Sequence, residues 1–142
     1  MGTRALTFVY DGEKPIVNLY RQYDGYPTGH GAELAEFLNG FKIVNGIGAE
    51  KTRIANGMGC LAAQMVAHFK DSVGGFYIHS VDATECGQDY EYHVYQKDKE
   101  LRVRVTDRGC NMFGLTMSDT NEGIFDGTVA EFVKFCFDES YA

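Results

Sequence analysis

The chain begins with two strand-like segments on either side of an Asp-Gly turn: Ala5-Leu6-Thr7-Phe8-Val9-Tyr10-Asp11-Gly12-Glu13-Lys14-Pro15-Ile16-Val17-Asn18-Leu19-Tyr20-Arg21-Gln22-Tyr23. Residues 5–10 alternate and residues 16–23 resume the β-rich composition, so this run predicts a β-hairpin. Val17, Leu19 and Arg21 share one face of the second strand, because side chains alternate along a strand. Arg21 therefore lies on or beside the apolar face and needs a partner, which is Asp24, a carbonyl group or a bound anion.

The rest of the chain alternates helical and strand-like patterns in an order typical of an α+β domain. Apolar spacing predicts helices over 32–41, 60–70 and 127–137, the last with Asp126 or Thr128 as N-cap. Strand composition covers 75–81, 90–96 and 101–106, which we expect to form a meander with a tip at 97–100. We expect residues 1–142 to form a single domain, an antiparallel sheet of about five strands with about three helices packed mainly on one face.

Composition limits the classes of partner. The formal net charge is −7, from 20 acidic and 13 basic side chains, so a nucleic acid polymer would be repelled, whereas a small anion needs only two or three placed arginines. No apolar run reaches transmembrane length. The four cysteines contain no C-x-x-C pair and the histidines have no ligand spacing, so we expect no metal, no cofactor, free thiols and a cytoplasmic location.

Residues 20–31 are the chemically densest segment, and they carry the first candidate site. Its candidate ligand-binding residues are Tyr20, Arg21, Tyr23, Asp24, Tyr26, Gly29, His30 and Gly31. The tyrosines offer stacking faces, Arg21 can pair with phosphate, and the amides of residues 29–31 can cradle an anion at the start of a helix. Flanking glycines lead us to expect an exposed, neutral His30. The alternative is a turn whose tyrosines pack on the core.

A second candidate surface lies on the predicted strands 90–96 and 101–106. Arg102 and Arg104 share the face opposite the core, and His93 and Tyr95 share a face of the preceding strand. If these strands pair, the four side chains form a basic, aromatic surface for an anionic ligand or a partner subunit. The alternative is a solvated face with ion pairs to Glu91 and Glu100.

We assign no catalytic residues. The Gly46–Thr52 segment ends in Lys-Thr before a helix, but Glu50 stands where a phosphate-binding loop requires glycine. Cys60 and Cys110 are candidate thiols, since a helix start stabilises a thiolate, but cysteine is commonly a small buried hydrophobe. A small hydrolase that pairs His30 with Asp24 or Cys60 is one alternative function.

The motif Tyr20-Arg21-x-Tyr23-Asp24-Gly25-Tyr26-Pro27-x-Gly29-x-Gly31 resembles one found in small, largely uncharacterised proteins of bacteriophages and bacteria. The resemblance covers about a dozen residues and implies a phage counter-defence factor that sequesters a nucleotide immune signal, such as a cyclic oligonucleotide or cyclised ADP-ribose. We therefore expect a non-enzymatic binding protein for a small anionic nucleotide-like ligand, acting as a homo-oligomer. The alternative from another class is an acidic protein–protein inhibitor of a host defence protein.

Overall fold

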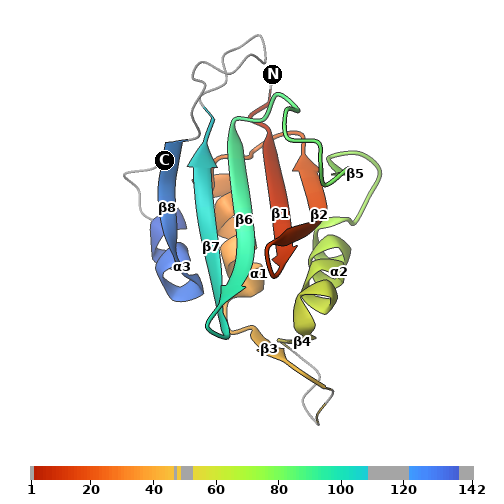
Figure 1. Cartoon of the computed structure of the whole chain (residues 1–142). Coiled ribbons are helices and arrows are strands. Elements are labelled where there is room, and N and C mark those ends of the chain that lie inside the picture. The colour runs from red at the N-terminus through yellow and green to blue at the C-terminus, as the bar shows by residue number, and fades with distance from the viewer. Residues whose placement is uncertain (1, 47, 49–52, 109–121, 138–142) are drawn as a thin grey trace.

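The computed structural model describes residues 2–46, 48, 53–108 and 122–137, which form eight strands and three α-helices (Figure 1). The strands are β1 (Ala5–Asp11), β2 (Lys14–Arg21), β3 (Lys42–Val44), β4 (Ile54–Asn56), β5 (Phe76–His79), β6 (Tyr90–Lys97), β7 (Glu100–Asp107) and β8 (Glu122–Thr128). The helices are α1 (Ala32–Leu38), α2 (Gly57–Phe69) and α3 (Val129–Cys136), and a π-helical turn, Pro27–Gly31, precedes α1.

Six of the strands form one sheet in the order β5-β2-β1-β6-β7-β8, and β3 pairs with β4 in a second, small sheet. All neighbours in the large sheet are antiparallel except β1 and β6, which are parallel. The α+β class with a mostly antiparallel sheet is confirmed, as are the β1–β2 and β6–β7 hairpins. The predicted meander is wrong, because β5 joins the free edge of β2 while β6 pairs with β1 at the centre of the sheet.

The route of the chain around α2 explains this difference. Helix α2 packs against β1 and β2, so the chain leaves the helix beside the β2 edge and pairs there as β5. Residues 80–89 then cross to the centre of the sheet, where β6 begins. A pattern of strand composition contains no information about such a crossing, because it identifies strands and not their neighbours.

All three helices cover the same face of the large sheet, behind the strands in Figure 1. The predicted stripe on α1 is buried at Leu34, Phe37 and Leu38, whereas Phe41 lies beyond the end of the helix and is only partly buried. The other fully buried side chains of this core include Val9, Leu61, Met65, Tyr92, Val94, Val103, Val105 and Phe132. Every burial of this kind removes apolar area from water, which is the main driving force of folding.

Helix α3 begins as its sequence indicates. The Thr128 hydroxyl accepts a hydrogen bond from the amide of Glu131, whose carboxylate accepts from the amide of Thr128, which makes a capping box. Of the two predicted N-caps, Thr128 is therefore correct. No helix in the described part of the chain combines the length and apolarity that crossing a membrane requires.

The opposite face of the large sheet carries no helix in the described residues (Figure 1). We call it the open face. Its central row runs across the strands in register, through His79, Asn18, Phe8, His93, Arg104 and Asp126. Asn18 of this row donates hydrogen bonds to the carbonyls of Ser80 and Ala83. Phe8 and His93 are buried, whereas Arg104 and Asp126 are exposed.

Candidate functional site

Arg21, the central residue of the first candidate site, points into the protein. Its guanidinium pairs with the Glu33 carboxylate, and its carbon Cζ lies 5.0 Å from the centre of the Phe76 ring. The side chain is 90% covered, so the predicted position on the apolar face is confirmed. Among the described residues its ion-pair partner is Glu33 of α1, and not Asp24.

His30 is completely buried, and the expectation of an exposed ring is wrong. The π-helical turn places the ring against Phe69 and Tyr92, with Nε2 2.7 Å from the Thr7 hydroxyl oxygen and Nδ1 3.3 Å from Arg21 Nη1. Arg21 only donates, so Nδ1 accepts and the ring proton is on Nε2. Burial, and then the charge of Arg21, lower the pKa of His30 to about 3.

The amides that could have cradled an anion are all used within the chain. The amides of Gly29 and Gly31 donate to the Tyr26 carbonyl at 2.9 and 3.4 Å, and the amide of His30 donates to the Asp24 carbonyl at 2.7 Å. A β-carbon at Gly29 would lie 2.5 Å from that Asp24 oxygen. The glycine at 29 is therefore required for packing, and the turn has no free donor among these three amides.

The tyrosines of the segment do not converge on Arg21. Tyr20 lies on the open face, stacked on His79 with the ring centres 4.8 Å apart. Tyr23 and Tyr26 are exposed, and the Tyr26 hydroxyl donates to Asp24 at 3.3 Å. The eight candidate residues of this segment are thus divided among the core, the open face and the outer surface.

The residues of the alternative hydrolase are not arranged as a catalytic pair. Both nitrogens of His30 are engaged by Thr7 and Arg21, and the Cys60 sulfur accepts a hydrogen bond from Gln64 at 3.3 Å. Cys110 and the 49–52 part of the glycine-rich loop lie outside the described residues. Within the described residues, no group of three or more His, Cys, Asp or Glu side chains is placed to hold a metal ion.

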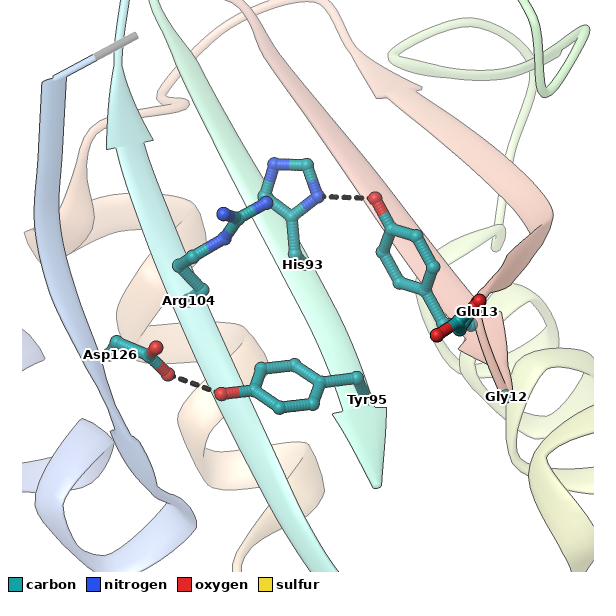
Figure 2. A pocket seen from close by; sticks show the side chains of 7 residues that line it. Gly12, Glu13, His93, Tyr95, Arg104 and Asp126 are labelled. Carbon is teal, nitrogen blue, oxygen red and sulfur yellow. Dashed lines mark hydrogen bonds between the residues drawn. The ribbon is translucent and has the colours of Figure 1, made fainter. Parts of the chain in front are cut away.

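The second candidate surface contains a pocket of about 350 Å³ on the open face (Figure 2). Four strands and the β1–β2 turn contribute its lining, which is Tyr10, Gly12, Glu13, His93, Tyr95, Arg104 and Asp126. The sheet register explains this convergence: His93 is paired with Arg104, and Arg104 with Asp126. His93 lies between the buried Tyr92 and Val94, and Arg104 between the buried Val103 and Val105, so strand alternation directs both side chains to the open face.

Arg104 is the cation of this pocket. It is exposed, and within the part of the chain that the structure describes its guanidinium makes no ion pair and no hydrogen bond. Arg102, two residues earlier on the same face, is paired with Glu100 at 3.3 Å, and the Tyr95 hydroxyl donates to Asp126. The predicted ion pair to Glu100 is therefore present at Arg102, while Arg104 keeps its donors available for a ligand.

A hydrogen-bonded chain of four side chains lies beside Arg104. The Tyr10 hydroxyl is 2.8 Å from His93 Nδ1, His93 Nε2 is 3.2 Å from the Glu91 carboxylate, and Glu91 is 2.8 Å from Arg108 Nη1. His93 also stacks on Phe8, with the ring planes 7° apart. A second pocket of about 410 Å³ adjoins the first, shares Tyr10 and His93 with it, and includes Glu85, Glu91 and Arg108.

Burial and nearby polar groups shift the pKa values of Glu91 and Tyr10 in opposite directions. Burial raises the pKa of the Glu91 carboxyl, but the hydrogen bonds from His93, Gln88 and Arg108 outweigh it, so the pKa is lowered overall. Burial raises the pKa of Tyr10, although the nearby Arg104 opposes this. Glu91 is therefore a carboxylate, and Tyr10 a neutral phenol, at neutral pH.

Sequence reasoning anticipated part of this site. The two strands pair as expected, and their register places His93 opposite Arg104 and Tyr95 opposite Arg102. Tyr10, Glu13 and Asp126 were not predicted as lining residues, because β1, the β1–β2 turn and β8 could not be placed beside β6 and β7 from the sequence pattern. The available signal was the alternation in β1, which puts Tyr10 opposite to the buried Val9.

Comparisons with protein-family models, with curated proteins and with solved structures give no match to this chain.

Proposed function

We propose that this protein binds a small nucleotide-like anion in the Arg104 pocket of the open face. The observation that carries the proposal is the Arg104 guanidinium, which has no ion pair within the described residues and lies in a pocket with Tyr10, His93 and Tyr95. An arginine offers planar, bidentate donors that match a phosphate, and aromatic rings offer faces on which a base stacks.

The size and charge of the site favour a small ligand over a polymer. Pockets of about 350 and 410 Å³ are within the range of small-molecule sites. One available guanidinium is enough for a phosphate group, whereas a net charge of −7 opposes a nucleic acid strand that carries many phosphates.

The biological role that we propose is sequestration of a nucleotide immune signal, of the cyclic oligonucleotide or cyclised ADP-ribose class. The support for this role is the resemblance of residues 20–31 to the motif of small phage and bacterial proteins. A sequestering protein binds its ligand and releases it chemically unchanged. Its function therefore depends on binding affinity and not on catalytic turnover.

Calorimetry with AMP, cyclic di-GMP and cyclic ADP-ribose tests the proposal. We expect micromolar or tighter binding of at least one of them, and a loss of about 10- to 100-fold in affinity in Arg104→Gln, since a charged hydrogen bond contributes about 1.5–3 kcal/mol.

Arg102→Gln is the matched control, because it removes the same charge from the same face two residues away, where the guanidinium is already paired with Glu100. We expect it to change affinity less than threefold. Binding that is equally reduced in both variants would indicate nonspecific attraction, and binding that is unchanged in Arg104→Gln would remove this pocket from the function. Chromatography of the released nucleotide checks that it is intact.

A further inference from the structure

His93 lies between two partners that determine where its proton is. Nε2 faces the Glu91 carboxylate at 3.2 Å, and an ionised carboxylate can only accept a hydrogen bond. A ring with one proton therefore carries it on Nε2. Its Nδ1 must then be an acceptor, and the atom at 2.8 Å from Nδ1 is the Tyr10 hydroxyl oxygen.

The Glu91 carboxylate is held in place by more than His93. It is 96% covered, and it accepts from Arg108 Nη1 at 2.8 Å and from Gln88 Nε2 at 2.7 Å. Removal of its charge would leave the buried Arg108 guanidinium without this partner. The proton on His93 is therefore oriented by a packed ionic cluster and not by a mobile side chain.

This arrangement determines whether the Tyr10 hydroxyl can donate or accept a hydrogen bond with a ligand. A phenol has one proton, and here that proton is donated to His93 Nδ1, so only the lone pairs of the oxygen remain for a ligand. The carboxylates of Glu13 and Asp126, which line the same pocket, are acceptors too. Arg104 is thus the hydrogen-bond donor of this pocket. The other polar side chains can only accept hydrogen bonds, so the ligand has to donate them.

We infer that the ligand of the Arg104 pocket is a ribonucleotide, whose sugar hydroxyl donates a hydrogen bond to the Tyr10 oxygen while its phosphate pairs with Arg104. This inference rests on the proposed function. A vicinal diol beside a phosphate supplies donors and an anion within a few ångströms of each other, which is the combination that an acceptor-rich pocket with one guanidinium requires. In many nucleotide-binding sites an acidic side chain accepts hydrogen bonds from the ribose hydroxyls.

A comparison of AMP with 2′,3′-dideoxy-AMP tests the inference. The two probes share the base and the phosphate and differ only in the two donors. We expect the wild-type protein to bind AMP about tenfold more tightly than the dideoxy probe, since one hydrogen bond contributes about 1 kcal/mol. In Tyr10→Phe we expect this ratio to fall to about one, through weaker binding of AMP. Tyr20→Phe removes a hydroxyl elsewhere on the open face and should keep the tenfold ratio.

The outcomes separate this inference from the proposed function. Equal binding of both probes by the wild type, or a ratio that survives in Tyr10→Phe, would overturn the ribose assignment. If Arg104→Gln then still lowers the affinity for both probes equally, the phosphate site at Arg104 is supported without the ribose assignment. If neither probe binds, the ribose assignment is overturned, while the proposed function is still decided by the calorimetry with cyclic di-GMP and cyclic ADP-ribose. If Arg104→Gln leaves both affinities unchanged, the proposed function fails as well.

Discussion

We expect the protein to lose about 2 kcal/mol of unfolding free energy between pH 6.5 and pH 4.5 through the single imidazole of His30. The pKa of this group falls from its ordinary value of 6.5 to about 3 in the folded protein, because burial and the adjacent Arg21 disfavour the charged ring. Below pH 6.5 the unfolded chain therefore binds a proton that the folded protein does not, and stability falls by about 1.4 kcal/mol per pH unit. The loss continues until the folded ring titrates near pH 3.

Urea unfolding at a series of pH values measures this effect. His30→Gln should remove most of the slope between pH 6.5 and 4.5, whatever its stability at pH 7. His68→Gln is the control, because His68 is exposed on α2 and its replacement should keep the slope. Glu91, whose pKa is lowered, adds a loss of the same sign only below about pH 4.5. A His30→Gln protein with the wild-type slope would show that the pKa of His30 is not lowered in the folded protein.

A second large effect is expected at Arg108. The variant Arg108→Leu leaves the covered Glu91 carboxylate with Gln88 and His93 alone, and we expect a loss of about 3 kcal/mol in unfolding free energy, since a buried charge without its partner is costly. Thermal or urea unfolding measures it.

The double variant Arg108→Leu/Glu91→Leu provides the contrast. It removes both charges from the same buried volume and should be more stable than Arg108→Leu alone. Arg102→Leu, which breaks an exposed pair, should change stability little. If the double variant is the less stable of the two, the Glu91–Arg108 contact is not what stabilises the open face.

The sequence was most informative where one strand or helix could be considered alone. Alternation identified the buried side of Arg21 and the outward side of Arg104, and the apolar spacing of residues 127–137 predicted α3 with Thr128 as one of two possible N-caps. These are consequences of backbone geometry within a few residues, and they do not depend on the rest of the fold.

The remaining features depend on partners that are distant in the chain. The flanking glycines of His30 suggested exposure, but they permit a close turn that buries the ring against Phe69 and Tyr92. Tyr10 reaches His93 across 83 residues, because β1 pairs in parallel with β6. No local pattern encodes that pairing, so half of the candidate site could not be predicted from the sequence.

The most direct test of the open-face site is an amide NMR titration of the labelled protein with the tightest-binding of AMP, cyclic di-GMP and cyclic ADP-ribose. We expect the largest shift changes at Tyr10, His93, Tyr95, Arg104 and Asp126, and little change at the amides of residues 23–31. Shift changes centred on Tyr23 and Tyr26, or none with any of the three nucleotides, would contradict the proposed open-face site.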